Sequence, residues 1–440
     1  MTFKLMKLAS QSQLSSWLPS IHPQVWIFAV GRFFSEVGTG FTLFYAPIFF
    51  VNQVGLSATS VGVALGSASI SGIVGRIVGG SLADSGHWGR RRTLLLATAI
   101  SAIGSLVLAA TSNFTILVIG SLISGLGIGF YWPAAESVVA DASEIDNRRE
   151  TFAIARLADN LGLAIGIVLA GFLITIIGSY RWLFVIDAIS FLVFFGVIYL
   201  GISETEQHQM EESEKTEHFA FWMTVLSVDA KRLVVRHRRF LVYIAVNIFF
   251  TIYISQIHST LPLYFKNFVI KSTTEGFTQT TISVLFAWHL VLAIICQLPV
   301  TSALKRCSHT LALTVSAIFW AIGFGLIWVS GTAPSHNLVW VILALGVFAV
   351  AIVSYTPSAA SLVTELAPEN QRGVYFSINA VCWAVGSFIG HPLGGWALDQ
   401  PEIIIDSLWL GFSLSVIIVV AILQYLNRIL PGEKPKFPHV

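Results

Sequence analysis

Two stretches of this chain decide its fold: residues 133–152, PAAESVVADASEIDNRRETF, and residues 357–376, PSAASLVTELAPENQRGVYF. They align without a gap at an offset of 224 residues. The same offset continues downstream, where NLGLAIGIVLAG at 160–171 aligns with AVGSFIGHPLGG at 384–395. A constant offset over a region of this length indicates an internal repeat. The sequence therefore predicts two similar halves.

The repeat extends beyond these stretches. Asn52 aligns with Asn267 at an offset of 215, and Lys305 stands in the place of Asp84 at an offset of 221. The charged residues inside the apolar segments of the first half are not repeated: the second half has no charged residue deep in its matching segments. We therefore expect the first half to carry the coupling chemistry and the second half mainly to shape a cavity.

The composition indicates which solvent these halves face. Hydrophobic residues make up 55% of the 440 residues and charged residues only 11%, whereas a soluble domain has about 25% charged residues. So few charges cannot cover a water-facing surface, but a chain that faces hydrocarbon needs few. The net charge of +2 gives no basic surface for nucleic acid. The composition predicts an integral membrane protein.

Apolar runs long enough to span a bilayer occur twelve times. A hydrocarbon core about 30 Å thick needs roughly 20 apolar residues per helix. The runs lie at approximately 24–50, 57–82, 93–111, 114–140, 151–177, 180–202, 240–266, 278–304, 309–331, 337–364, 373–397 and 405–428. We predict an all-α fold of twelve transmembrane helices. It divides into an N-terminal six-helix bundle over 1–202, a cytoplasmic central loop over 203–239 and a C-terminal six-helix bundle over 240–440.

Lysines and arginines divide unequally between alternate loops. With the amino terminus inside, 19 of the 25 lie in inside segments, three lie outside and three lie within spans. Because positive charge concentrates on the cytoplasmic side of membrane proteins, this split predicts cytoplasmic amino and carboxyl termini. We expect the protein in the inner membrane of a bacterium. Residues 221–239, apolar with a basic end, are open to two interpretations: an interfacial helix or a solvated linker.

The loop after the second predicted span, GGSLADSGHWGRRR at 79–92, resembles the cytoplasmic loop signature of the major facilitator superfamily. The chain is similar to that superfamily over essentially its whole length, which implies secondary transport by alternating access. In the family this loop stabilises one conformation of the cycle. The resemblance implies such a conformational role for the matching residues Gly80, Asp84, Gly89, Arg90 and Arg91. The chain departs from the signature at Ser85, where the family usually has a basic residue.

Two further stretches, SLISGLGIGFYWPAAE at 121–136 and NLGLAIGIVLAG at 160–171, resemble fourth- and fifth-helix motifs of the drug/proton antiporters. The resemblance implies proton-coupled efflux of a lipophilic or amphipathic solute. Ser121 replaces an arginine and Ile167 a proline of those motifs. Two alternatives therefore stay open: an importer or uniporter of a sugar, carboxylate or other nutrient, and a non-transporting membrane sensor on a transporter scaffold.

Ionisable residues inside spans are candidates for coupling because charge is costly there. Arg32 and Glu36 lie four residues apart on one helix face, which permits a direct ion pair. Burial disfavours an ionised Glu36 and the neighbouring arginine favours it, so the pair is either a protonation switch or a permanent structural pair. Asp159 and Asp187 are further coupling candidates, although Asp187 could instead be a structural partner within the bundle.

Other polar residues suggest a gate and a cavity. Arg156 and Asp159 are candidates for a cytoplasmic gate network with Glu136 or Asp141, although the side chains of Arg156 and Asp159 could instead reach out to the membrane surface. We expect Arg76 to anchor a helix–helix contact. In the superfamily the first, fourth, seventh and tenth helices line the cavity, and an aromatic lining suits an amphipathic solute. The residues placed there are Phe33, Tyr45, Tyr131, Trp132, Asn247, Tyr253, Gln256, His258 and Tyr355. Each aromatic residue could equally serve helix packing.

No stretch of the sequence indicates an enzyme. Cys296, Cys307 and Cys382 lie far apart and lack metal-ligand spacing. The run GLGIG at 125–129 follows no predicted strand, so it is no dinucleotide fingerprint. We expect no catalytic activity, no cofactor and no metal. The expected partners are a small-molecule solute, protons and the lipid bilayer, with a monomer as the functional unit.

Overall fold

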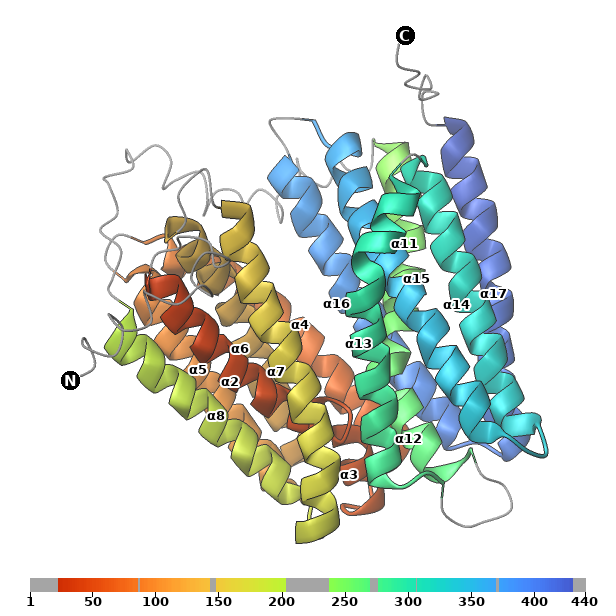
Figure 1. Ribbon diagram of the computed structural model, residues 1–440, viewed down its shortest axis with the longest axis horizontal. Coiled ribbons are helices and arrows are strands. Elements are labelled where there is room, and N and C mark those ends of the chain that lie inside the picture. Colours follow the sequence, from red (N-terminus) through yellow and green to blue (C-terminus); the bar gives the residue numbers. More distant parts are fainter. Residues whose placement is uncertain are drawn as a thin grey trace, which may run out of the picture.

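The computed structural model describes residues 23–85, 88–142, 148–202, 237–269, 276–305, 307–368 and 372–429. All regular secondary structure in this part of the chain is helical (Figure 1). The predicted central loop at 203–239, with the possible interfacial segment at 221–239, lies outside the described residues except for its last three.

The described helices form two groups. In the first half they are α2 (Pro23–Leu43), α3 (Ala46–Asn52), α4 (Ala58–Ala83), α5 (Gly89–Ala109), α6 (Phe114–Asp141), α7 (Arg148–Ile177) and α8 (Arg181–Gly201). In the second half they are α11 (Arg238–His258), α12 (Thr260–Asn267), α13 (Gln279–Leu304), α14 (His309–Thr332), α15 (Asn337–Leu366), α16 (Arg372–Leu398) and α17 (Glu402–Ile429). Eleven described segments are long and apolar enough to cross a membrane, with α2 and α3 counted together. The 27-residue α16 adds a further long helix.

Several helices begin where the sequence supplies an N-cap. The side chains of Ser57, Asn113, Thr278 and Ser308 each accept a hydrogen bond from the backbone N–H three residues on. Such caps satisfy one of the N–H groups that a helix start leaves unpaired. Ser57 and Thr278 are equivalent residues at the repeat offset of 221, so the two halves start their second spans with the same local chemistry.

The first span of each half is divided, unlike the single runs that hydropathy predicts. Pro47 lies in the first turn of α3 and Pro262 in the first turns of α12, and a proline removes a backbone donor from a continuing helix. The short helices α3 and α12 contact each other. There Asn52 and Asn267 exchange two side-chain hydrogen bonds of 2.8 and 2.9 Å. The repeats therefore meet symmetrically, through residues at the offset of 215.

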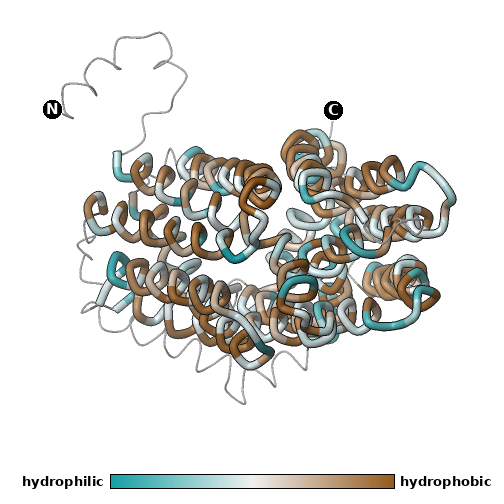
Figure 2. Tube along the Cα trace, turned by 90° about the horizontal axis from the view of Figure 1, so that it is seen from below, coloured by the Kyte–Doolittle hydropathy of each residue, from teal (hydrophilic) through white to brown (hydrophobic). Residues whose placement is uncertain are grey.

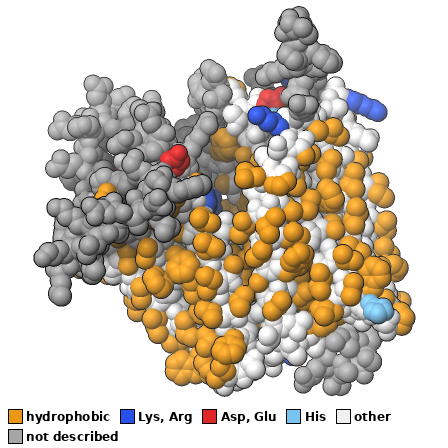
Figure 3. Space-filling model, viewed as in Figure 1, with side chains coloured by type: hydrophobic (Ala, Val, Ile, Leu, Met, Phe, Trp, Pro, Cys, Tyr) orange, Lys and Arg blue, Asp and Glu red, His pale blue; other side chains and the backbone are white. Residues whose placement is uncertain are grey.

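The outer surface is apolar. Large exposed hydrophobic side chains are frequent, with Leu200, Leu298 and Ile403 between 75% and 85% exposed. Figure 3 shows one flank covered by hydrophobic side chains, with charged side chains in view mostly toward its upper edge. Seen end-on, the helices form two groups whose outward turns are largely hydrophobic (Figure 2). Contact with lipid tails is favourable for such a surface, whereas contact with water is not.

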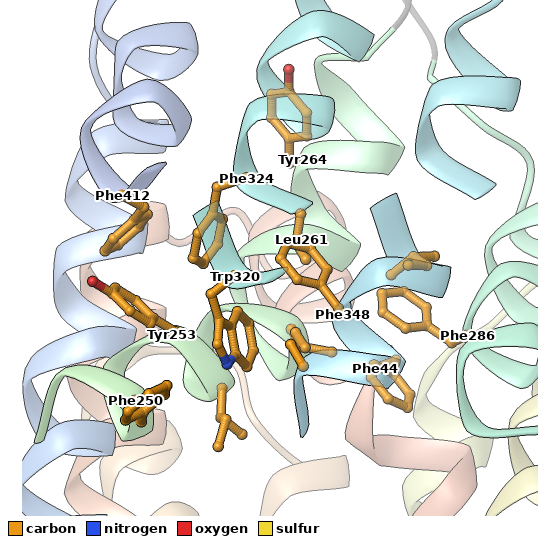
Figure 4. Close-up of a cluster of buried hydrophobic side chains, with 14 of the residues drawn as sticks. Phe44, Phe250, Tyr253, Leu261, Tyr264, Phe286, Trp320, Phe324, Phe348 and Phe412 are labelled. Carbon is orange, nitrogen blue, oxygen red and sulfur yellow. The ribbon is translucent and has the colours of Figure 1, made fainter. Parts of the chain in front are cut away.

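An aromatic cluster fills the core of the second half (Figure 4). Trp320 and Phe324 of α14 pack at 5.6 Å between ring centroids, and both contact Tyr253 of α11. The apolar packing continues to the first half, where Phe44 stacks on Phe286 with centroids 4.1 Å apart. Burial of large rings stabilises this half and its contact with the first half.

In the described part of the chain the two halves meet mainly where α4 contacts α16, where α7 contacts α13 and where α3 contacts α12. Every hydrogen bond between the halves that joins two described residues lies where Asn52 meets Asn267. We call this end of the molecule the closed end. The other, where the loop between α4 and α5 lies, we call the motif end. Figure 1 shows the two groups of helices diverging toward the motif end.

At the closed end, α4 and α16 approach to backbone contact. A Cβ added to Gly395 would lie 2.2 Å from the carbonyl oxygen of Ala58, and one added to Gly62 would lie 2.3 Å from that of His391. Only glycine permits such an approach. The carboxylate of Asp399 accepts hydrogen bonds of 2.9 and 2.8 Å from the first two backbone N–H groups of α4. A negative charge at a helix N-terminus stabilises this contact further.

Replacing Gly395 by alanine is expected to separate the halves at the closed end. Relieving the overlap with the Ala58 carbonyl oxygen costs about 1–3 kcal/mol, and each 1.4 kcal/mol changes an equilibrium about tenfold. The measurement is the rate of disulfide cross-linking between Asn52→Cys and Asn267→Cys in a chain whose three native cysteines are replaced. Gly395→Ala should slow cross-linking by about tenfold.

Gly411→Ala is the matched control, because no atom lies within 4 Å of its Cβ position. It should leave the cross-linking rate unchanged. Equal slowing by both variants would show that the glycine-to-alanine change itself, rather than the contact between α16 and α4, controls the closed end.

Candidate functional site

A buried ion pair joins α2 to α7. Nε of Arg32 donates to Oδ1 of Asp159 at 2.7 Å, and a terminal nitrogen of the guanidinium donates to Oδ2. Arg32 is 2% exposed and Asp159 is 8% exposed. Helical spacing permitted a pair between Arg32 and Glu36, but the structure pairs the guanidinium with Asp159, 127 residues away. The two-bond geometry fixes the two helices relative to each other.

Aromatic rings enclose this guanidinium. Its central carbon lies 5.6, 5.7 and 5.6 Å from the ring centroids of Phe28, Tyr131 and Trp132. A cation is attracted to the faces of such rings. The structure thus brings two of the predicted cavity residues, Tyr131 and Trp132, to the Arg32 ion pair. Phe33, a third, is half-buried and packs edge-on against the ring that follows it in sequence.

Glu36 lies one helical turn beyond Arg32 in α2 and is partly buried. Among the described residues, none forms a hydrogen bond or an ion pair with it. A glycine leaves room for it, because a Cβ at Gly162 would lie 3.0 Å from the Glu36 Cβ. The charged side chains that act on it electrostatically are Arg32, Arg156, Asp159 and Asp187. Glu36 is therefore an acid within a span that has nearby charges but no fixed partner in the described structure.

Asp187 of α8 is a second acid inside the first half, and it is 5% exposed. One of its oxygens accepts a hydrogen bond of 2.6 Å from Ser105, and the other has no partner among the described residues. A Cβ at Gly38 would lie 2.8 Å from that second oxygen. Asp187 therefore packs against the same helix that carries Glu36.

The two candidates for a gate come together near the motif end. Arg156 donates to Glu136 at 3.2 Å, and its guanidinium lies 5.0 Å from the ring centroid of Trp132. Both charged side chains are about half exposed, at 52% and 53%. Asp141, the other acid considered for this network, forms an ion pair with Arg90 instead. Half-exposed pairs of this kind stabilise a fold only slightly.

The loop that resembles the family signature caps α4 and ties α5 to its neighbours. Asp84 is the C-cap of α4, where its N–H bonds the carbonyl oxygen of Gly80 at 3.1 Å. Gly89 begins α5 with φ of +81°, a conformation that glycine adopts readily. Arg90 bonds the Ser137 carbonyl oxygen at 3.3 Å and pairs with the acid at the end of α6. The first turn of α5 is thereby tied to α6.

Arg91 makes a second connection from the same turn. It donates to the carbonyl oxygen of Tyr199 at 2.7 Å, and its guanidinium lies 5.3 Å from the centroid of that ring. The loop residues thus connect α5 to both α6 and α8. These bonds hold the motif end of the first half together as one body.

Three predicted cavity residues form hydrogen bonds within the second half, two of them with each other. The Tyr355 hydroxyl donates to the side-chain oxygen of Asn247, whose amide donates to the side chain of Asn379 at 2.9 Å. Gln256 donates to the Gly390 carbonyl oxygen at 2.9 Å. All three predicted residues are at most 2% exposed. Their polar groups fasten α11 to α15 and α16.

The remaining predicted cavity residues lie in three different places. Tyr253 is fully buried in the aromatic cluster, where its hydroxyl bonds Ser415 of α17 at 2.6 Å (Figure 4). It therefore packs toward α14 and α17 rather than toward the first half. Tyr45 lies at the closed end and donates to a backbone carbonyl of α13 at 2.8 Å. His258 is half-buried, with its ring 5.7 Å from Phe44 of the other half.

A cavity of about 220 Å³ lies between α4 and α6 of the first half and α16 of the second. Its lining includes Gly72, Arg76, Gly129, Ser377, Trp383 and Ser387. The expected anchoring of a helix contact by Arg76 is not what the structure shows, because no described residue bonds its guanidinium and the side chain lines this cavity.

Sequence reasoning missed the contact of Asp399, which caps α4 from the other half. Nothing local marked that residue, since the contact joins positions 341 residues apart. Arg76 did carry a signal, because an arginine within an apolar run is a candidate for function. The sequence could not show that the space beside it is a cavity.

Residues 28–273 and 267–439 match the family model of the Major Facilitator Superfamily. A Na(+), Li(+), K(+)/H(+) antiporter of Planococcus maritimus is 22% identical over 408 residues, covering 89% of this chain and 91% of the relative. The multidrug resistance protein MdtH of Aeromonas hydrophila is 23% identical over 387 residues, covering 86% and 88%.

Solved structures share the fold. The nucleoside transporter NupG superposes with a TM-score of 0.75 at 14% identity, covering 92% of this chain and 99% of NupG. Two helical bundles with a cavity between them, and transporters as relatives over nearly the whole length, define a membrane transporter. The chain belongs to the Major Facilitator Superfamily.

Proposed function

We propose that this protein is a proton-coupled secondary transporter that exports a lipophilic or amphipathic solute by alternating access. The observation that carries the proposal is Glu36, an acid within a span, one turn from the Arg32–Asp159 pair and without a bonding partner of its own in the described structure. An acid that couples transport must gain and lose a proton inside the membrane. A permanent ion pair would oppose that exchange.

The arrangement suggests how protonation moves the helices. When Glu36 is ionised, Arg32 lies near two carboxylates, its own partner Asp159 and Glu36 one turn away. When Glu36 carries a proton, the ion pair with Asp159 is undisturbed. Because that pair joins α2 to α7, a change of charge on Glu36 acts on the contact between these helices.

We place the motif end in the cytoplasm, because positively charged residues concentrate on that side. The structure then corresponds to a state closed toward the outside. Opening to the outside requires separation of α4 from α16 where Gly395 and Asp399 meet the start of α4. Rocking of one half against the other around a central site is the usual form of such a change.

Exchange of monovalent cations for protons is a second candidate. It is favoured by the similarity to the Planococcus antiporter and by two acids inside the first half, Glu36 and Asp187, that lack ion-pair partners among the described residues. Carboxylate oxygens are ligands that hard cations prefer. The two acids could then bind a cation or a proton in turn.

A flux assay separates these functions. The full chain is reconstituted in liposomes that contain a pH-sensitive dye, and naphthalene-2-sulfonate, glucose or sodium chloride is added outside under an imposed pH gradient. We expect proton movement with the amphipathic naphthalene compound and none with glucose or sodium. Proton movement with sodium alone would identify a cation antiporter. Uptake of radiolabelled glucose without a change in the dye signal would identify a uniporter.

A further inference from the structure

We propose that the cavity beside Arg76 binds the anionic group of the solute, so that the transported compounds are amphipathic organic anions. The inference names the substrate class of the transport function proposed above and rests on it for transport, but binding of the anion is independent of proton coupling.

Arg76 lies well inside its helix and on its inner face. It precedes Ala83, the last residue of α4, by seven residues, which places it about 10 Å from the helix end. The exposed apolar residues of α4, Ile70, Val74 and Val78, repeat every four positions along one face. Arg76 is two positions from Val74 and Val78, a rotation of about 200°, so it lies on the opposite face. That face meets α6 and α16 at the cavity.

Arg76 has no fixed counter-ion in the described part of the chain. No described residue forms a hydrogen bond or an ion pair with it. Glu136 acts on it electrostatically, but that carboxylate is paired with Arg156 at 3.2 Å. Its side chain is exposed in the cavity, where water solvates it and a ligand can reach it. Arginines within spans face such cavities and mark the paths of solutes and ions. A bound anion would take the place of that water as the partner of the guanidinium.

The cavity walls suit an anion with an apolar body. Along with Arg76, the lining includes Ile73, Ile128 and Trp383, which are apolar or aromatic, and the polar residue Ser387. A guanidinium binds carboxylates and similar planar or tetrahedral anions through two parallel hydrogen bonds. The volume of about 220 Å³ is below the 300–1,000 Å³ typical of drug-sized ligands. It therefore fits a small aromatic or aliphatic anion rather than a bulky dye.

The position of the cavity also suits transport. Its lining comes from α4 and α6 of the first half and from α16 of the second. A ligand that contacts both halves can bind differently in the two states of an alternating-access cycle. Differential binding of this kind is what allows a ligand to shift a conformational equilibrium.

The test compares two ligands of nearly the same size and shape, one anionic and one neutral. Binding of naphthalene-2-sulfonate and of its neutral analogue naphthalene-2-sulfonamide is measured by isothermal titration calorimetry on the purified full-length protein in detergent. We expect the wild-type protein to bind the sulfonate about tenfold more tightly than the sulfonamide, since a charge-assisted hydrogen bond discriminates by about that factor. Arg76→Gln should remove this preference, and Arg76→Lys, which keeps the charge, should retain part of it.

Three controls complete the experiment. Arg428→Gln removes an exposed arginine at the end of α17 and should leave the preference intact. Ala384→Trp, which fills the cavity from α16, should weaken binding of both ligands and thus tests the site independently of Arg76. Glu36→Gln should keep the preference for the anion, so that a failure of proton coupling is distinguishable from a failure of this site.

The outcomes decide the proposal. Absence of sulfonate binding by the wild-type protein, or a preference for the sulfonate that survives Arg76→Gln, would overturn it. Unchanged binding in Ala384→Trp would equally place the ligand elsewhere. Loss of the preference in Arg428→Gln as strongly as in Arg76→Gln would show that general positive charge, rather than this cavity, attracts the anion.

Discussion

Glu36→Gln is expected to abolish solute transport driven by a pH gradient, while exchange of solute without a gradient continues. The amide has nearly the shape of the carboxyl group but cannot take up and release a proton at physiological pH. Because Glu36 bonds no described residue, the substitution removes no contact seen in the structure. The apparent Tm of the purified protein should therefore stay within about 2 °C of wild type. Flux into proteoliposomes and a thermal melt measure the two effects.

Two companion variants make this result specific. Glu36→Asp keeps a titratable group and should retain coupled transport at a reduced rate. Asp187→Asn removes the other acid of the first half that lacks an ion pair among the described residues, and comparison of the two positions shows which acid the coupling requires. Gradient-driven transport at the wild-type rate in Glu36→Gln would remove this residue from the mechanism. Loss of exchange together with coupling would assign it a structural role.

The fold was predictable because its determinants are local. Each predicted span overlaps a helix of the structure, since a run of about 20 apolar residues can satisfy its backbone in a bilayer only as a helix. The N-caps at Ser57 and Thr278 were visible as residue types at equivalent positions of the repeat. Even the weak alignment of Asn52 with Asn267 has a physical basis, because the two amides bond each other where the repeats meet.

The partners within the site were not predictable, because they depend on how helices approach. Spacing along α2 suggested Glu36 as the partner of Arg32, but close contact between α2 and α7 brings Asp159 to it instead. Two glycines permit this approach: a Cβ on Gly40 would lie 2.6 Å from a carbonyl oxygen of α7, and one on Gly166 would lie 2.2 Å from a carbonyl oxygen of α2. The glycines were visible in the sequence, but the resulting register was not.

Residue type likewise did not show which way a side chain points. Tyr253 and Tyr355 both lie in helices that were expected to line a cavity. Tyr253 instead packs among Trp320 and Phe412, where three helices bury its ring. A period of 3.6 residues identifies a helix, but in a helix that is apolar on all sides it does not indicate which face meets which neighbour. The cavity depends on how α4, α6 and α16 lie against one another in space, which the sequence does not show.

Breaking the Arg32–Asp159 pair from one side is expected to cause the largest loss of stability of any single change in the first half. Arg32→Ala leaves a carboxylate without its partner, and Asp159→Asn leaves a guanidinium that is 2% exposed without its counter-charge. Removing one partner of a buried ion pair costs about 3–5 kcal/mol. Each single variant should therefore show a markedly lower apparent Tm in a thermal melt of the purified protein.

The double variant Arg32→Met with Asp159→Leu separates the charge effect from packing. Replacing both members of a buried pair by apolar residues of similar size is often neutral or stabilising, so the double variant should be more stable than either single one. Arg156→Ala is the control, because its pair with Glu136 is about half exposed and contributes about 1 kcal/mol or less. A double variant as unstable as the sum of the single losses would show that the two charges act independently. If the charge on Glu36 acts through this ion pair, the double variant should be stable but should lose gradient-driven transport. Its α2–α7 contact is then uncharged, so protonation of Glu36 no longer changes it.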